Sequence, residues 1–270
     1  MKRLRDKAAV VVGGSSGFGE AIARQFIAEG ARVMVAARGE ERLRKVADEL
    51  GALARVCDAT RWDDLKDLAD EAVAALGGLD VAVNCAGFED NCPISNLEPA
   101  RVEKMVAVQF TGALYFLQHM GNAMQAGGSI VTISSLTATL VAEGYAPYAG
   151  AKAGINHASR IAASEFGARG VRVNLVSPTT VETPMIAQLL ATPGVKEAMI
   201  AETPLGDLPS VRDVVNAVLF LVSDESAFVT GENIHVDGGG SLRRLPRTDD
   251  IMQSIRTAMA QQQADAEGKT

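Results

Sequence analysis

Residues 8–19 read AAVVVGGSSGFG, and this stretch decides the fold. Its first part, residues 8–14, is continuously apolar and rich in valine, as is typical of a parallel strand that is covered on both faces. The segment Phe18–Glu29 then carries apolar residues at helical spacing and is followed by Gly30, a helix-terminating residue. The sequence therefore predicts a buried strand, a glycine-rich turn and a helix in direct succession.

The same alternation of strand and helix continues along the chain. Further strands are predicted at Arg32–Ala37, Ala52–Val56, Leu79–Asn84, Ser129–Ser134, Arg172–Ser177 and Asn233–Val236, and further helices at Glu40–Leu50, Trp62–Leu76, Arg101–Gln125, Tyr148–Phe166 and Arg212–Ser223. Repeated strand–helix wiring produces a parallel sheet with helices on its faces. We therefore expect an α/β fold, a doubly wound parallel sheet of about seven strands.

No repeat or low-complexity linker divides the chain, so one domain is expected over residues 1–240. Within it, residues 185–210 are rich in Met, Leu, Ile and Pro but lack a strand period, which favours a partly helical substrate lid. The tail, residues 241–270, has a different character and a predicted helix at Asp250–Gln262. Contact with a neighbouring subunit and disorder are both open for this tail.

Composition excludes several classes of protein. The 270 residues are 47% hydrophobic, 22% charged and 4% aromatic, the proportions of an ordinary globular enzyme. The net charge of −7, without blocks of like charge, argues against nucleic acid and anionic membranes as partners. Neither a signal peptide nor a membrane-spanning run is apparent, so a cytoplasmic location is expected.

Metal and disulfide sites are not expected either. The cysteines number three and form no C-x-x-C pair, which gives neither a disulfide framework nor a zinc site. The histidines are scattered without the spacing of metal ligands. These residues are Cys57, Cys85 and Cys92, and His119, His157 and His235.

The glycine-rich turn is suited to a phosphate group. Backbone can approach a pyrophosphate closely where side chains are missing, and the first N–H groups of the following helix favour an anion. A tight turn that binds nothing is the alternative. The residues predicted to bind a cofactor in this turn are Gly13, Ser15, Ser16, Gly17, Phe18 and Gly19.

The end of the second strand bears on the choice of cofactor. An NAD site of this kind usually places a carboxylate there for the ribose 2′-OH, whereas this chain has Arg38, which favours the 2′-phosphate of NADP. In the alternative, Arg38 is a solvated surface charge and Glu40 or Glu41 reaches the ribose. Asp58, after the third strand, is expected on the adenine side.

Three polar residues form a candidate catalytic group: Ser135, Tyr148 and Lys152. Tyr148 and Lys152 are four residues apart on a predicted helix and therefore share a face. An ammonium close to a phenol lowers the pKa of the phenol from about 10, as a general acid/base at neutral pH requires. Tyr145 competes with Tyr148 but lacks a lysine four residues later. A Tyr–Lys pair on a helix surface is the alternative without function.

With these motifs in order, residues 6–240 resemble the short-chain dehydrogenase/reductase family. The motifs are the Gly13–Gly19 loop, Asp58, Asn84-Cys85-Ala86-Gly87, Ile133-Ser134-Ser135, Tyr148-x-x-x-Lys152, Arg172-Val173-Asn174, Pro178 with Thr183, and Val236-Asp237-Gly238-Gly239. The resemblance implies a single Rossmann-type domain and a homo-oligomer, specifically a tetramer. It also implies that Tyr148 is the catalytic acid/base, that Ser135 orients the carbonyl, and that Lys152 binds the nicotinamide ribose. Further cofactor contacts are implied for Asp58, Ala59, Asn84, Ala86, Gly87, Pro178, Val181 and Thr183.

This chain departs from the family pattern at three positions. Val12 stands where the family has a threonine that braces the glycine turn, and Thr179 stands where glycine usually follows the proline. In Val108-Gln109-Phe110-Thr111-Gly112, Gln109 replaces the usual catalytic asparagine of the proton relay behind Lys152. Gln109 keeps the amide on a longer side chain, so we expect retained activity with an altered relay. In the alternative, Gln109 only packs.

The expected function is an NAD(P)-dependent alcohol dehydrogenase or ketoreductase, with NADP preferred over NAD. It would move a hydride between nicotinamide and the carbinol or carbonyl carbon of a mostly apolar secondary alcohol or ketone. No basic cluster suggests an acyl-carrier or coenzyme A phosphate. The other hypothesis is a catalytically weak cofactor-binding scaffold or regulatory subunit. Apolar walls for the substrate are expected from Met185, Ile186, Leu189, Leu190, Met199 and Ile200, and from Phe88, Pro93 and Ile94.

Overall fold

Seven parallel strands form one sheet in the computed structural model, in the order β3-β2-β1-β4-β5-β6-β7. The structure describes residues 2–183 and 186–267. This order reverses next to β1, as in doubly wound folds, and confirms the predicted class. The strands are β1 (Ala8–Val12), β2 (Arg32–Ala37), β3 (Leu53–Val56), β4 (Val81–Asn84), β5 (Ser129–Ile133), β6 (Arg172–Pro178) and β7 (Asn233–Val236).

The central strand β1 is apolar at every position because it is covered on both faces. Its side chains alternate: Ala8, Val10 and Val12 belong to one hydrophobic core, and Ala9 and Val11 belong to the other. This is the period of two that an extended strand imposes. The run of valines therefore places the glycine turn at the middle of the sheet.

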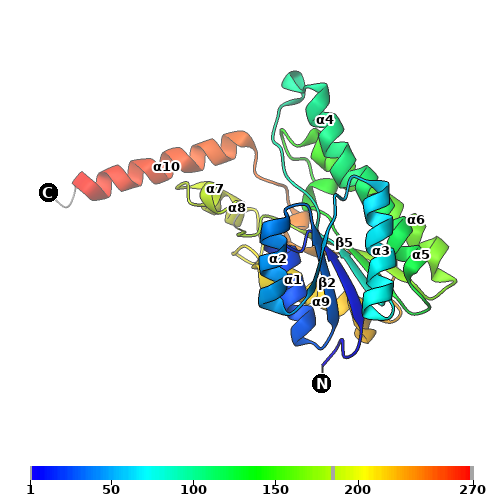
Figure 1. The fold of residues 1–270 in the computed structure, drawn as a ribbon. Helices are drawn as coiled ribbons and strands as arrows, with labels where there is room; N and C mark the ends of the chain where they lie inside the picture. Colours follow the sequence, from blue (N-terminus) through cyan, green and yellow to red (C-terminus); the bar gives the residue numbers. More distant parts are fainter. Residues whose placement is uncertain (1, 184–185, 268–270) are drawn as a thin grey trace.

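Helices cover both faces of the sheet (Figure 1). One core contains Phe26 of α1 and Val218 of α9, and the other contains Phe116 of α5 and Ile155 of α6. The helices of the first layer are α1 (Gly17–Ala28), α2 (Glu40–Leu50) and α9 (Val211–Val222), and those of the second are α3 (Trp62–Leu76), α5 (Gly112–Ala123) and α6 (Ala146–Gly167). Short 3₁₀ turns lie at Ile94–Asn96, Leu136–Ala138, Asp224–Ser226 and Gly240–Leu242.

The helix predicted at Arg101–Gln125 is interrupted. It consists of α4 (Pro99–Val106), a π-helical turn over Ala107–Thr111, and α5. Gly112 follows the turn, and a Cβ there would lie 2.2 Å from the carbonyl oxygen of Ala59, so the helix passes unusually close to the loop after β3. π-turns of this kind are frequent at functional sites, and this one carries Gln109.

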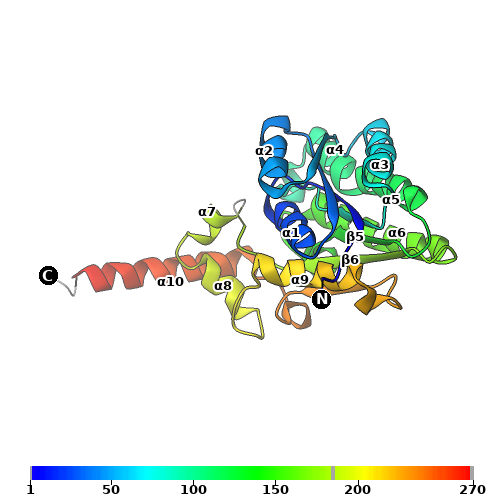
Figure 2. The ribbon, with the colours of Figure 1, turned by 60° about the horizontal axis from the view of Figure 1, so that its bottom comes forward.

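The lid and the tail lie side by side. The lid contains α7 (Ala187–Leu190) and α8 (Val195–Ala201), while Met185, where the predicted lid begins, lies outside the described residues. The tail forms α10 (Thr248–Glu267), which packs against α8 and then runs outward from the body (Figure 2). Within residues 2–183 and 186–267, none of the helices combines the length and the apolar character needed to cross a membrane.

Candidate active site

A cavity of about 1340 Å³ lies at the carboxyl ends of the strands. It is larger than the roughly 300–1,000 Å³ of most small-ligand sites, as a cofactor together with a substrate would require. Parallel strands all end at the same edge of the sheet, so motifs that are far apart in sequence meet there. The predicted site residues that line the cavity are Gly13, Ser15, Ser16, Gly17, Phe18, Gly19, Arg38, Asp58, Ala59, Ala86, Gly87, Gln109, Ser135, Tyr148, Lys152, Pro178, Val181 and Thr183.

Asn84 is the predicted site residue that is absent from the described cavity lining. Its side chain is buried, and its carboxamide oxygen accepts a hydrogen bond from the backbone N–H of Ala86 at 3.0 Å. Asn84 therefore shapes the loop that carries Ala86 and Gly87 into the cavity.

The glycine turn provides an open cradle at the start of α1. Gly17 has a φ of +54°, and nothing lies within 4 Å of the position that its Cβ would take. Ser16, the N-cap of α1, makes no side-chain capping hydrogen bond, so the first N–H groups of the helix keep no side-chain partner there. A free helix N-terminus beside an open glycine fits the pyrophosphate of a dinucleotide.

Backbone hydrogen bonds brace this turn where the family threonine is missing. The N–H groups of Gly13 and Gly14 donate to the carbonyl oxygen of Ala36 at 2.8 and 3.2 Å. Val12 can therefore be apolar without loosening the turn. The second departure is also accommodated, because Thr179 is not among the residues with positive φ and donates its N–H to Val236 at 3.3 Å.

Two arginines line the far end of the cavity, beyond the glycine turn. Arg38 is exposed there, and Arg42 donates from Nε to the carbonyl oxygen of Ser15 at 2.8 Å. Glu40 is bound by Arg44 at 2.7 Å, and neither Glu40 nor Glu41 belongs to the described lining. Arg42 was not predicted. Its position in the first turn of α2, shortly after the end of β2, is the signal that could have found it.

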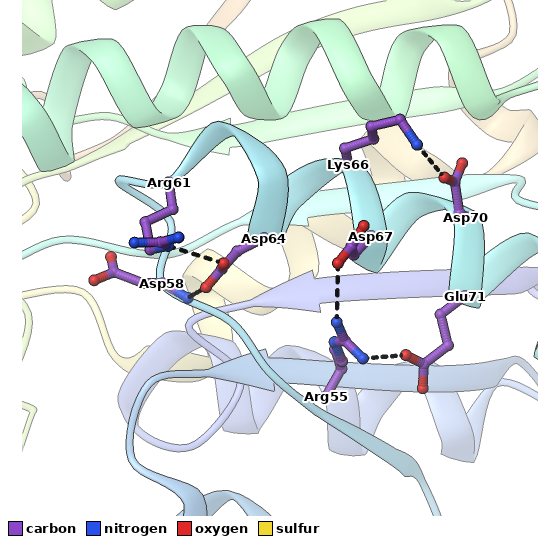
Figure 3. Close-up of polar contacts among 8 residues, drawn as sticks. All are labelled: Arg55, Asp58, Arg61, Asp64, Lys66, Asp67, Asp70 and Glu71. Carbon is purple, nitrogen blue, oxygen red and sulfur yellow. Dashed lines mark hydrogen bonds and ion pairs between the residues drawn. The ribbon is translucent and has the colours of Figure 1, made fainter.

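Asp58 also lines this end. Burial opposes its ionisation, but two hydrogen bonds from Thr60, at 2.8 and 3.0 Å, and the charges of Arg38 and Arg61 hold its pKa below the ordinary value. Asp64 fixes the loop, because its carboxylate accepts the Asp58 N–H at 2.9 Å and an Arg61 hydrogen bond at 3.1 Å (Figure 3). The carboxylate of Asp58 is therefore ionised and held in place.

The structure brings Ser135, Tyr148 and Lys152 together in the middle of the cavity. Ser135 and Tyr148 share a side-chain hydrogen bond, and the Ser135 oxygen also accepts one from Thr137 Oγ1 at 3.0 Å. The Lys152 ammonium lies 5.7 Å from the centre of the Tyr148 ring. Tyr148 and Lys152 are nearly buried, at 7% and 5% exposure, which argues against a pair on an open helix surface.

The expected lowering of the Tyr148 pKa by Lys152 is wrong for this geometry. Burial raises the pKa of Tyr148, the carboxylate of Glu89 raises it further, and the hydrogen bond with Ser135 only partly opposes them. Lys152 is not among the groups that shift the Tyr148 pKa. Burial lowers the pKa of Lys152 itself to about 8, and its Nζ donates to the Ile133 carbonyl oxygen at 2.7 Å. At neutral pH the phenol of Tyr148 is therefore in its protonated form and can donate a proton.

Gln109 spans the π-turn and the loop after β4. Its Nε2 donates to the carbonyl oxygen of Phe88 at 2.8 Å, and Gly87 lies so close that a Cβ there would be 2.8 Å from this nitrogen. The Oε1 atom is buried without a hydrogen-bond partner among the described residues. One side of the amide therefore anchors a loop, and the other presents a buried acceptor with unused capacity.

The substrate end of the cavity has residues that the sequence did not reveal. These residues are Glu89 and Asn91, and Tyr145, the candidate that competes with Tyr148, lines the cavity with them. The rings of Tyr145 and Tyr148 meet edge to face at 6.1 Å. The tail of the same chain also reaches this end of the cavity. The tail residues in the lining are Leu245, Pro246, Thr248, Ile251 and Met252.

The apolar walls match the expectation in part. Ile186, Leu189, Leu190, Met199 and Phe88 line the cavity. Ile200 and Pro93 are not in the described lining, and Ile94 is 73% exposed on a 3₁₀ turn. The substrate end therefore has mixed character, with apolar walls and a few polar groups.

Comparisons with known proteins agree with this site. A family model described as enoyl-(acyl carrier protein) reductase matches residues 12–241. The chain is 36% identical to cis-4-hydroxycyclohexanecarboxylate dehydrogenase of Sinomonas cyclohexanicum, over 87% of this chain and 96% of that protein. It is 35% identical to 4-formylbenzenesulfonate dehydrogenase of Comamonas testosteroni, over 88% and 99%. A short-chain type dehydrogenase/reductase from Mycobacterium ulcerans superimposes with a TM-score of 0.88 at 32% identity, over 94% of this chain and 98% of the other.

Proposed function

The chain belongs to the short-chain dehydrogenase/reductase family of oxidoreductases, and from that membership we propose that it is an NADP-preferring alcohol dehydrogenase or ketoreductase. The family uses nicotinamide cofactors. The proposed substrate is a small, mostly apolar secondary alcohol or ketone. The observation that carries the proposal is the meeting of Ser135, Tyr148 and Lys152 in one cavity with the open glycine cradle.

Each residue of the group has a proposed role. The nicotinamide would supply or accept the hydride. In reduction the protonated phenol of Tyr148 gives its proton to the carbonyl oxygen, and in oxidation the phenolate form of Tyr148 takes the proton from the alcohol. The Ser135 hydroxyl hydrogen-bonds the same oxygen, which fixes the reacting carbon. Lys152 binds the cofactor ribose, and Gln109 holds the water of the proton relay through its free acceptor.

The preference for NADP is supported by the two arginines at the far end of the cavity. Arg38 and Arg42 both line it, and a phosphate with two negative charges is a better partner for guanidinium groups than a hydroxyl. A carboxylate that could bind the ribose 2′-OH is not supplied by Glu40, which is held by Arg44. In the glycine cradle and along the strand ends, the cofactor would contact the predicted residues that line the cavity, whereas Asn84 would act through the loop it shapes.

The proposal does not assign the substrates of the two relatives to this chain. Both relatives are named for molecules with an acidic group, whereas a carboxylate of this chain, Glu89, lines the substrate end. The walls supplied by Leu189, Met199 and Met252 favour an apolar substrate body. A ketone or alcohol without a negative charge is therefore the substrate class that we propose.

A cytoplasmic homotetramer with one catalytic domain over residues 1–240 is part of the proposal. The tetramer rests on the family resemblance and on the small residues of α6, such as Ala149, Gly150 and Ala153, which permit close helix packing. The cysteines are all free, as is usual in a reducing compartment. Light scattering on the purified protein tests the assembly, and a monomeric mass would overturn it.

A substrate panel tests the proposed activity. Purified protein is assayed with NADPH and a set of ketones, and with NADP and the matching alcohols, against the Tyr148→Phe variant. Turnover at least about a hundredfold above the variant, with cofactor binding unchanged in both proteins, is the expected result. Equal rates for the two proteins on every substrate would instead favour the catalytically weak scaffold.

A further inference from the structure

Glu89 stands out at the substrate end because its carboxylate has no hydrogen-bond or ion-pair partner among residues 2–183 and 186–267. The loop that carries it is anchored by the hydrogen bond from Gln109 to Phe88 at 2.8 Å. The next residue, Asp90, is paired with Arg101, whose Nε donates to it at 2.7 Å. By contrast, neither a hydrogen bond nor an ion pair engages Glu89 within the described part of the chain, and its side chain is exposed to the cavity.

The other carboxylates of the cavity are already in use. Asp58 lies at the far end and accepts two hydrogen bonds from Thr60. Glu143 accepts hydrogen bonds from the hydroxyl and the N–H of Thr248 at 2.8 and 3.2 Å. Among the carboxylates that the described lining contains, only Glu89 therefore has its full acceptor capacity open to a ligand.

Glu89 also lies close to the groups that would perform the chemistry. Glu89 lines the same cavity as Lys152, Tyr145 and Tyr148, and its charge acts on all three. Asn91 and Tyr145, which share a side-chain hydrogen bond, flank it. A substrate whose reacting oxygen contacts Tyr148 would therefore occupy the cavity that Glu89 lines.

The balance of charge at this end disfavours anions. Of the cations in the described lining, Arg38 and Arg42 lie at the opposite end, and Lys152 is bound to the Ile133 carbonyl. A negatively charged substrate would meet Glu89 with Lys152 as the one cation at this end of the described lining, and the two like charges would repel each other. A hydroxyl or an ammonium would instead form a strong hydrogen bond with the carboxylate.

We propose that Glu89 is a specificity-determining residue that selects alcohols and ketones with a hydrogen-bond donor, a hydroxyl or an ammonium, on the carbon next to the reacting one, and that excludes substrates with an acidic group there. This inference rests on the proposed function and defines its substrate class. The apolar walls contact the body of the substrate, and the Glu89 carboxylate accepts a hydrogen bond from the neighbouring hydroxyl or ammonium.

Four cyclohexanols that differ only at the adjacent carbon test this selection. They are cyclohexanol, 1,2-cyclohexanediol, 2-aminocyclohexanol and 2-hydroxycyclohexanecarboxylate, each oxidised with NADP at pH 8. For the wild type we expect kcat/KM for the diol and the amino alcohol to exceed that for cyclohexanol by about tenfold or more, since one charge-assisted hydrogen bond has that effect. The hydroxy acid should fall at least about tenfold below cyclohexanol.

The Glu89→Gln variant removes the charge and keeps the size of the side chain. It should lose at least about tenfold on the amino alcohol, lose less on the diol, and gain on the hydroxy acid. Glu71→Gln is the matched control, because Glu71 pairs with Arg55 at 2.7 Å and lies outside the described lining of the cavity. Its ratios between the four substrates should stay within about twofold of the wild type.

Two outcomes separate this inference from the proposed function. If cyclohexanol is oxidised above the Tyr148→Phe background but Glu89→Gln leaves the four ratios unchanged, the role of Glu89 is wrong and the proposed function stands. If none of the alcohols is oxidised, the proposed function fails for this class. Calorimetric titration of the same four compounds in the presence of NADP then decides the inference, which is overturned if wild type and Glu89→Gln bind them equally.

Discussion

The ammonium of Lys152 lies 5.7 Å from the centre of the Tyr148 ring and donates a 2.7 Å hydrogen bond to the carbonyl oxygen of Ile133. At 5% exposure, Lys152 is a charged group that has little contact with water. Burial lowers its pKa from 10.5 to about 8. The group that the proposed chemistry requires therefore weakens the fold while it is protonated.

This relationship predicts how Lys152→Met changes stability with pH. Below pH 8 the folded wild type must bury the ammonium. The free energy of unfolding of the variant should therefore exceed that of the wild type by on the order of 3 kcal/mol, and the variant should unfold at the higher temperature. Between pH 8 and 10.5 the folded wild type loses the proton while the unfolded chain keeps it, so wild-type stability rises and the advantage of the variant shrinks. Thermal unfolding at pH 7 and pH 10 measures this difference. A difference that is the same at both values would contradict the prediction.

Arg38→Ala should change the choice of cofactor. Loss of a charge-assisted contact with the 2′-phosphate should raise the Kd for NADPH by about 10- to 100-fold and leave the Kd for NADH nearly unchanged. Arg42→Ala should also raise the Kd for NADPH, but by less, because the Nε of Arg42 already donates to the Ser15 carbonyl oxygen. Calorimetric titration measures both constants.

Arg44→Ala is the control, since Arg44 lies on the same helix as Arg42, pairs with Glu40 and is outside the described lining. Tighter binding of NADH than of NADPH by the wild type would refute the assignment.

Local pattern was sufficient for much of this molecule. The sheet, the glycine turn and the Tyr148–Lys152 pair depend on residues that are close in sequence, so periodicity and spacing predicted them. The contact between Thr248 and Glu143 joins residues 105 positions apart, so no local sequence pattern could predict it. The π-turn also left no trace, because it depends on the approach of Gly112 to Ala59 and not on a change of hydrophobic period.

The sequence also led to an incorrect electrostatic expectation for Tyr148. Spacing predicted that Lys152 shares a helix face with Tyr148, and it does. The sign of the pKa shift, however, depends on burial and on Glu89, which comes from another loop. The number of charges around a group is a tertiary property, so helical spacing alone could not give it.

Gln109 offers a test of the relay. Gln109→Ala removes the bond to Phe88 and the free Oε1 acceptor, so kcat should fall and KM should rise, each by about tenfold. Gln109→Asn keeps an amide that is one methylene shorter and should recover part of the rate if a water can bridge the gap. Rates and pH profiles of the three proteins measure the effect. If both variants match the wild type in rate and profile, Gln109 only packs.

Thr248 joins the tail to the wall of the cavity, which makes the tail part of the proposed substrate site. Its hydroxyl and N–H both bind Glu143, and the hydrogen bonds hold the pKa of Glu143 below its ordinary value. Thr248→Val removes the hydroxyl hydrogen bond with little change of shape. We expect a rise of KM by a few-fold for apolar substrates with the Kd of NADPH unchanged, because the tail lines only the substrate end.

Two further variants decide whether this effect comes from the contact itself. Thr257→Val is the control, since Thr257 is exposed on the same helix, donates its hydroxyl to the Gln253 carbonyl at 3.0 Å and lies outside the described lining of the cavity. Truncation after Arg247 removes Thr248, Ile251 and Met252 from the lining and should raise KM further than Thr248→Val does. Because α10 packs against α8 of its own chain, these effects should persist in any oligomeric state. A truncated protein with unchanged kinetics would show that the tail contributes nothing to substrate binding, even though its residues line the cavity.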